Sequence, residues 1–121
     1  MFLRTSSRMY GSAAILDCNG KIIFGEETAL LRRQVKELLG QSQGVVLNLS
    51  NVYFLDSAGV GELVRLHTSA TAQRKRIVLA GLTGRVRDVL QITRLATVFP
   101  TYASATEAAE SLSARAAGAG D

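Results

Sequence analysis

The stretch FLDSAGVGELVRL, Phe54 to Leu66, decides the fold and raises the question of function. An apolar run stops at Asp56, a serine follows, and two glycines stand within the next four residues. From there the apolar residues recur at the spacing of an amphipathic helix, which we expect over Ser57 to Gln73. Ser57 is either only a cap of this helix or a site where chemistry happens.

Strands and helices alternate on both sides of this junction. The run VVLNL, Val45 to Leu49, is typical of an interior strand, and residues 51–55 connect it to the helix. A helix is predicted over Glu26 to Leu39, with Gly40 as its C-terminal cap. Later elements are a strand at Ile77 to Leu79, a helix over residues 85–93, a short strand at Val98 and Phe99, and a helix capped by Thr106.

The start of the chain predicts a pair of antiparallel strands, Ser12 to Leu16 and Lys21 to Phe24, because Asn19-Gly20 between them is a strong hairpin signal. Together the elements predict the α/β class: one small mixed sheet with helices packed against it. We expect this domain over residues 12–114, a loosely ordered N-terminus over residues 1–11 and a frayed end over residues 115–121.

Composition fits one globular domain of 121 residues, with 47% hydrophobic and 20% charged residues. The net charge of +4 permits an acidic partner without requiring one. The only basic cluster, Arg74-Lys75-Arg76, has no interleaved aromatic residues, so direct nucleic-acid binding is not predicted. A single cysteine, Cys18, and no apolar run near the ~18 residues that would span a bilayer indicate a cytoplasmic protein without a membrane span.

Ser57 has two interpretations. Asp and Ser are both preferred helix N-caps, because a side-chain oxygen accepts from the free N–H groups of the first turn. Alternatively, a hydroxyl at a helix start can receive a phosphate, because the dipole there favours negative charge. Such a phosphate would add roughly −1.5 to −2 charges beside Asp56 and repel a docked acidic partner.

Catalytic sites are not predicted. The only histidine, His67, lies on the same predicted helix roughly 15 Å from Ser57 along the axis, too far to act as its base. Leu55 stands where a serine hydrolase has the first glycine of its G-x-S-x-G turn. Metal-ligand spacing and a phosphate-binding loop are also missing, so no metal and no cofactor are expected; GLTGRVR, Gly81 to Arg87, is interpreted as a tight turn into a helix.

These residues resemble a known family, the STAS domain of sulphate transporters and anti-sigma factor antagonists, and most of all its small bacterial antagonists. The segments that carry the resemblance are VVLNLSNVYFLDSAGVGELVRL and RIVLAGLTGRVRDVLQITRLATVFPTYASATEAAESL. Members often carry an acidic residue near the serine, for which Glu26 or Glu27 is available. Members also often have glycine in the place of Arg94.

The resemblance implies a function. In phosphorylated members the serine of this motif, here Ser57, is modified by a kinase that is also an anti-sigma factor, and a metal-dependent serine phosphatase restores it. The unmodified form binds the kinase and frees a sigma factor. The implied partner surface comprises Asp56, Ser57, Ala58, Gly59, Gly61, Gly81 and Thr83. A constitutive scaffold or adaptor, in a stress-signalling assembly or a lipid-transport complex, is the alternative, and a homodimer is possible in either case.

Overall fold

The structure is a computed structural model that describes residues 1–119, with side chains described for residues 1–114. Its strands and helices follow one another as β1 (Leu3–Tyr10), β2 (Ala13–Ile22), α1 (Glu26–Leu39), β3 (Gly44–Leu55), α2 (Ser57–Ala72), β4 (Arg76–Ala80), α3 (Gly84–Ile92), the 3-10 turn η1 (Leu95–Thr97), β5 (Thr101–Tyr102) and α4 (Ala105–Ala119). The predicted bounds of α1 are confirmed, and those of α2 and α3 are confirmed to within one residue.

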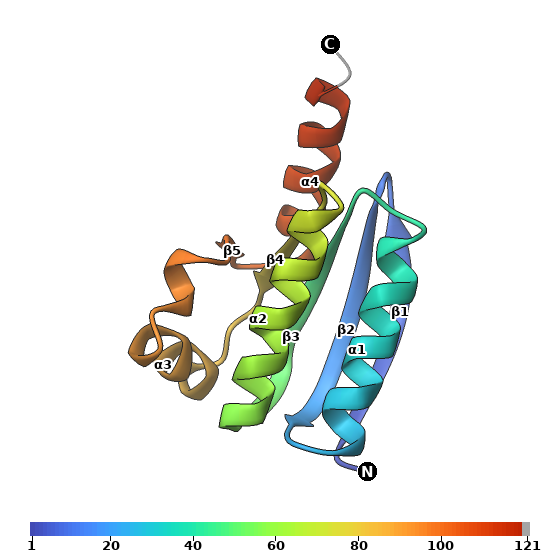
Figure 1. Cartoon of the computed structure of the whole chain (residues 1–121). Helices are drawn as coiled ribbons and strands as arrows, with labels where there is room; N and C mark the ends of the chain where they lie inside the picture. Colours follow the sequence, from blue (N-terminus) through green and yellow to red (C-terminus); the bar gives the residue numbers. More distant parts are fainter. Residues whose placement is uncertain (120–121) are drawn as a thin grey trace.

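The five strands form one mixed sheet in the order β1-β2-β3-β4-β5 (Figure 1). Strands β1 and β2 are antiparallel, and every later neighbour is parallel. Each parallel step is joined by a helix that crosses over the sheet, as parallel pairing requires. The predicted class, a single α/β domain with a small mixed sheet, is confirmed.

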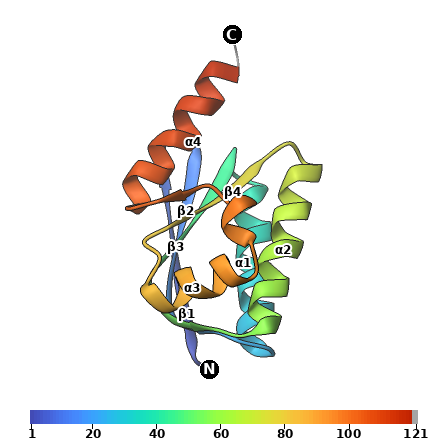
Figure 2. The same ribbon diagram turned by 90° about the vertical axis from the view of Figure 1, so that its left-hand side faces the viewer.

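Helices cover both faces of the sheet (Figure 2). The larger core lies between the sheet and α1, α2 and α3, and its central residues, such as Leu47, Leu63 and Leu90, are fully buried. On the opposite face, α4 packs Ala105, Ala108, Ala109 and Leu112 against a smaller cluster around Ile15 and Val46. The sheet therefore holds its helices at fixed positions, and the loops that connect strands to helices lie at the ends of the strands.

The N-terminus differs from the prediction. The residues expected to be loosely ordered form β1, and the hairpin turn lies at Gly11 and Ser12. Asn19-Gly20 lies instead inside β2, opposite Leu3 and Arg4. Gly20 has a φ of 118°, and a Cβ there would stand 2.0 Å from the carbonyl oxygen of Phe2. Glycine serves a close approach of two strands at this position, although the dipeptide is typical of a turn.

Three smaller predictions are also corrected. Residues 51–55, expected to be a connection, continue β3. Val98 and Phe99 are not a strand; they follow η1, and the last strand is β5. Ser104 rather than Thr106 caps α4, because its hydroxyl accepts from the Glu107 N–H at 3.2 Å. At the end expected to be frayed, α4 runs to Ala119, and residues 120–121 lie outside the described residues.

Candidate functional site

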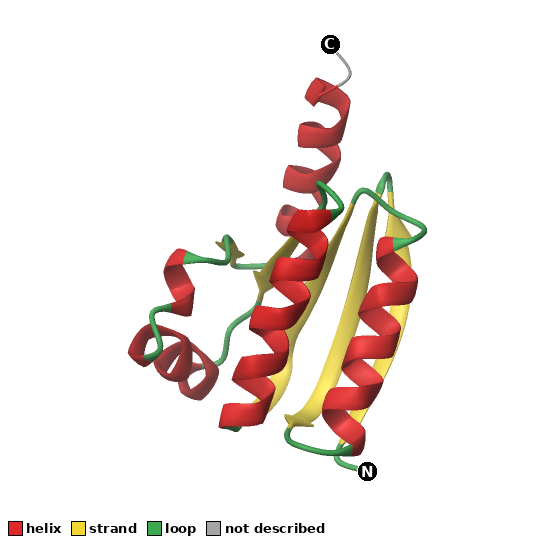
Figure 3. Cartoon of the chain, in the orientation of Figure 1, coloured by secondary structure: helices red, strands yellow, loops and turns green. Residues whose placement is uncertain are grey.

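The candidate site lies where β3 ends and α2 begins. Asp56 occupies the single position between these elements, with an extended backbone (φ −90°, ψ −179°), and acts as the N-cap of α2. The loop from β2 to α1 lies at the same end of the sheet (Figure 3). Carboxyl ends of parallel strands are where an open sheet of this kind carries its binding sites.

The carboxylate of Asp56 joins the two segments. Its Oδ1 accepts from the Gly59 N–H at 2.7 Å, and its Oδ2 accepts from the Phe24 N–H at 3.0 Å. The first bond satisfies a free donor at the helix start, and the second fixes the β2–α1 loop beside it. Asp56, and not Ser57, is therefore the cap, so a purely capping role for Ser57 is wrong.

Ser57 is the first residue of α2 and is exposed to solvent. Within the described residues, no hydrogen bond uses its hydroxyl, while Asp56 beside it is committed to two. The hydroxyl stands at the positive end of the helix dipole, where an added anion is tolerated by the fold. The arrangement therefore presents a free alcohol to a second molecule.

The two glycines of the turn have different surroundings. Gly59 is buried, and a Cβ there would lie 2.3 Å from the Ile22 carbonyl oxygen and 2.7 Å from Leu55 Cδ1. At Gly61 a Cβ would meet only the Arg65 guanidinium, at 3.7 Å or more. Gly59 is therefore required for packing, whereas Gly61 has room for a side chain and leaves the half-buried backbone of the first turn uncovered by one.

The loop after β4 runs beside the second half of β3. Gly81 packs on Ser50, with its N–H donating to the Tyr102 carbonyl at 3.0 Å. Two residues on, the Thr83 hydroxyl donates to the Val52 carbonyl at 2.9 Å and caps α3. Gly81 and Thr83, predicted as partner residues, thus have structural contacts that hold this loop along β3.

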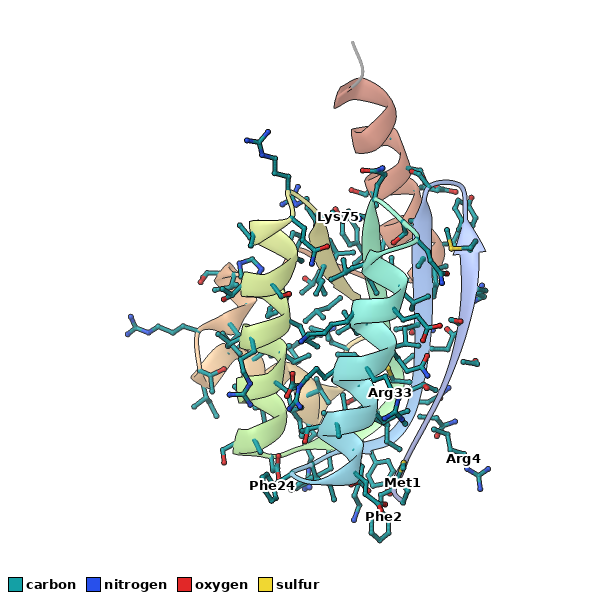
Figure 4. The ribbon with its side chains drawn as sticks, turned by 45° about the vertical axis from the view of Figure 1, so that its right-hand side comes forward. Met1, Phe2, Arg4, Phe24, Arg33 and Lys75 are labelled. Atoms are coloured by element: carbon teal, nitrogen blue, oxygen red, sulfur yellow. The ribbon has the colours of Figure 1, made fainter. Side chains whose placement is uncertain are left out.

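Two residues at this end of the sheet are not among the predicted partner residues. Arg85 places its guanidinium carbon 5.9 Å from the centre of the Phe54 ring, two residues before Asp56. Phe24, whose N–H binds Asp56, is 80% exposed. Figure 4 shows Phe24 at the same end of the molecule as the start of α2. A large exposed aromatic residue beside an exposed helix start is typical of a contact surface.

Farther along α2, a buried carboxylate was also missed. Glu62 is 1% exposed, and its Oε1 accepts from Arg32 Nη2 of α1 at 2.6 Å. Arg65 approaches the same oxygen at 3.6 Å. From the sequence alone, a glutamate in the GELVRL stretch is expected to face solvent. Its burial is understood only once its distant partner, Arg32, is known. The ion pair joins α1 to α2 and so positions the helix that carries Ser57.

Two other side chains with reactive groups, those of His67 and Cys18, have structural surroundings. His67 is half-buried and packs edge-to-face on Phe99, with ring centres 5.3 Å apart. Burial, aided by the charge of Asp17, raises the pKa of the Cys18 thiol to about 12, so the thiol is uncharged at neutral pH.

Within the described part of the chain, no group of His, Cys, Asp and Glu residues is arranged to hold a metal ion. None of the described helices combines the length and the apolar character needed to cross a membrane.

The mixed sheet and the β3–α2 junction are features of a known class of domain. A family model described as the STAS domain matches residues 5–108. The chain therefore belongs to the STAS domain family, as the central motif predicts.

Solved structures agree with this assignment. An anti-sigma factor antagonist from Mycobacterium paratuberculosis matches with a TM-score of 0.76 and 19% identity, over 91% of this chain and 93% of that one. The phosphorylated form of the Bacillus cell fate determinant SpoIIAA matches with a TM-score of 0.71 and 19% identity, over 90% and 99%. A sulfate transporter family protein from Wolinella succinogenes matches with a TM-score of 0.69 and 17% identity, over 84% of each chain. Identities this low establish a shared fold.

Proposed function

We propose that this protein is an anti-sigma factor antagonist whose partner affinity is set by phosphorylation of Ser57. In its bare form it binds an anti-sigma factor that is also a serine kinase, and a sigma factor is released. Phosphorylation ends the binding, and a metal-dependent serine phosphatase restores it. The protein acts in the cytoplasm as a substrate and binding partner and has no catalytic activity of its own.

The observation that carries this proposal is the exposed, unengaged hydroxyl of Ser57 beside a carboxylate already bound to two N–H groups. A kinase supplies ATP, magnesium and the base, so the substrate needs only an accessible alcohol. SpoIIAA, which has the same fold, has been solved in a phosphorylated form. Both facts support Ser57 as the acceptor.

The surface around Ser57 is suited to docking. Ala58 and Gly61 are half-buried and have small or absent side chains, so a partner can approach the backbone of the first turn. Phe24 supplies exposed apolar area on one side, and Arg85 lies on the side of the β4–α3 loop. A phosphate on Ser57 would place about two negative charges in the middle of this surface, next to Asp56. Desolvating these charges on binding costs far more than covering a hydroxyl.

The direct test is the intact mass of the protein after incubation with its cognate anti-sigma factor kinase and ATP. We expect a gain of one phosphate, its loss in Ser57→Ala and its retention in Ser69→Ala, which removes a hydroxyl farther along the same helix. No gain in the wild-type protein, or an equal gain in Ser57→Ala, would contradict the assignment of Ser57.

A charge at Ser57 is also expected to weaken binding without the kinase reaction. Ser57→Glu should raise the dissociation constant for the kinase roughly ten-fold or more, because a carboxylate must be desolvated beside Asp56. Titration calorimetry measures the affinity, and circular dichroism should remain unchanged. Equal affinity for the bare, phosphorylated and Glu forms would rule out the switch.

A constitutive adaptor is the second candidate, because the same fold also occurs in a sulfate transporter family protein from Wolinella succinogenes. In that case the same surface binds its partner at all times and Ser57 is never modified. Mass spectrometry of the protein purified from its source cell separates the two: a phosphorylated fraction supports the switch, and a single unmodified species in every growth condition supports the adaptor.

A further inference from the structure

Strand β1 forms an open edge of the sheet. It pairs with β2 on one side, and the strand order places no described strand on its other side. The Lys21 N–H donates to the Phe2 carbonyl, so the backbone of Phe2 points toward β2. Because the direction alternates along an antiparallel strand, Leu3, Thr5, Ser7 and Met9 direct their N–H and C=O groups outward. Such an edge is a template for another strand.

The sequence of this edge is chemically palindromic about Ser6. Counting outward, threonine faces serine (Thr5 and Ser7), and arginine faces arginine (Arg4 and Arg8). Next come two long apolar residues, Leu3 and Met9, and then two aromatic residues, Phe2 and Tyr10. A strand of this kind matches itself when it is turned end to end, which an arbitrary partner strand would not do.

We propose that β1 pairs with β1 of a second copy of this chain, antiparallel and with Ser6 opposite Ser6. A two-fold axis perpendicular to the sheet passes between the two serines, so the interface is the same surface on both protomers. The two sheets then continue as one. This inference concerns an edge distinct from the surface around Ser57 and does not depend on the proposed function.

The register satisfies the backbone. With Ser6 at the centre, Thr5 lies opposite the partner's Ser7, and Leu3 lies opposite the partner's Met9. Leu3, Thr5, Ser7 and Met9 have outward N–H and C=O groups, so each facing pair of these residues can exchange two hydrogen bonds. A register one residue away would place an outward backbone opposite an inward one and reverse the side-chain faces. The palindromic sequence and the alternation of outward N–H and C=O groups are therefore both satisfied by the alignment with Ser6 opposite Ser6.

The side chains also fit this pairing at the ends of the strand. Phe2 is 60% exposed and Tyr10 is 38% exposed, and the register places Phe2 of each protomer opposite the partner's Tyr10. Directly opposed aromatic residues on one face are favourable cross-strand pairs. Met9, exposed in the single chain, lies opposite the partner's Leu3. The aromatic pairs close both ends of the interface.

The arginines limit the affinity. Arg4 would face the partner's Arg8, a like-charge pair that opposes association. Arg8 is partly neutralised because its Nε donates to Asp17 at 2.9 Å, whereas no ion pair within the described residues involves Arg4. Arg4 extends from β1 away from the domain (Figure 4). We therefore expect a dimer that dissociates on the order of 10–100 µM and that tightens when salt screens the arginines.

The test is sedimentation analysis of the full chain from about 1 to 500 µM, comparing the wild type with single variants. Arg4→Glu replaces both like-charge pairs by opposite-charge pairs and should tighten the dimer roughly ten-fold. Arg33→Glu, which makes the same charge change on an exposed position of α1, should leave the constant unchanged. Ser7→Pro removes an N–H that points outward and makes no bond to β2, so the single chain keeps its own pairing. The dimer should weaken at least ten-fold.

Hydrogen exchange identifies the edge independently. At high protein concentration the amides of Leu3, Thr5, Ser7 and Met9 should become protected, while those of Arg4, Ser6 and Arg8 are protected at all concentrations. A chain that is monomeric at every concentration overturns the proposal. So does a dimer in which these amides stay open, or an equal effect of Arg4→Glu and Arg33→Glu. Protection that appears only on adding another protein would assign the edge to a different partner and also overturn it.

Discussion

Arg94 is held in the left-handed region of backbone conformation, with a φ of 61°, at the start of η1. A side chain in this region costs about 1 kcal/mol or more relative to glycine. STAS sequences often have glycine at the matching place, and the backbone of Arg94 gives the physical reason. Arg94→Gly should therefore raise the free energy of unfolding by about 1 kcal/mol, measured by urea denaturation.

Arg94→Ala is the control for this prediction, because it removes the guanidinium and keeps the Cβ. It should leave stability within about 0.5 kcal/mol of the wild type. Equal stabilisation by alanine and glycine would mean that the side chain, and not the backbone angle, is unfavourable.

At the scale of single residues, the sequence located the candidate site but assigned two roles incompletely. It could not decide between Asp56 and Ser57 as the cap, because both residue types favour that position. The bonds from Phe24 and Gly59 to Asp56 decide it. Glu62 could not be recognised as buried because its partner Arg32 is 30 residues away on another helix.

At the scale of one element, the first turn of α2 contains two glycines with opposite roles. Gly59→Ala would place a Cβ 2.3 Å from the Ile22 carbonyl oxygen, a backbone atom that cannot move aside easily. We expect a loss of about 2 kcal/mol of stability or more. Gly61→Ala meets only ordinary contacts and removes a flexible residue from a helix, so it should stabilise by about 0.5–1 kcal/mol.

Both variants carry the same chemical change two residues apart, so chemical denaturation of each tests the packing argument directly. Loss of stability in Gly61→Ala, or none in Gly59→Ala, would contradict the assigned roles. Under the proposed function, the added methyl at Gly61 should also weaken kinase binding even though the domain is more stable.

The junction between α1 and α2 should respond unequally to loss of its two charges. Arg32→Met leaves the buried Glu62 carboxylate with only Arg65, 3.6 Å away, and should cost about 2 kcal/mol. Glu62→Gln removes the buried charge and leaves Arg32, which is 45% exposed, to water, so it should cost about 1 kcal/mol or less. Thermal or urea unfolding of both variants tests this order, and the reverse order would contradict it.

Elements with strong apolar periodicity were predictable from sequence, and elements defined by tertiary contacts were not. Helix α1 was predicted to its ends because its apolar stripe, acidic first turn and Gly40 all agree. Strand β1 was missed because, apart from Leu3, it has no buried residue and is held by backbone pairing with β2. The two-residue strand β5 depends on its pairing with Leu79 and Ala80.

At the scale of the whole molecule, Cys18 should make stability decrease at alkaline pH. Its pKa is about 12 in the folded chain and about 8.5 when unfolded, so above pH 8.5 the unfolded chain loses a proton that the native chain keeps. The free energy of unfolding should therefore fall by up to about 1.4 kcal/mol per pH unit between these values. Urea unfolding at pH 7, 9 and 10 measures this slope.

Cys18→Ala provides the control, because it lacks the thiol and should show a flatter curve over the same range despite lower stability at pH 7. Parallel curves for the two proteins would contradict the buried thiol as the cause.

Asp17, on the same strand, contributes to the pH dependence of stability at acid pH. Burial alone would raise its pKa, but the bonds from Arg8 and Asn48 and the charge of Arg8 lower it, so its contribution is lost only as pH falls below about 4.

The double engagement of Asp56 has a kinetic consequence for the proposed switch. One oxygen accepts from the Gly59 N–H and the other from the Phe24 N–H, and no hydrogen bond within the described residues joins this carboxylate to the Ser57 hydroxyl. Under the proposed function, the base that takes the hydroxyl proton is then supplied by the kinase, and this chain contributes through docking. On that proposal, the phosphorylated fraction at steady state reports the balance between the kinase and the phosphatase.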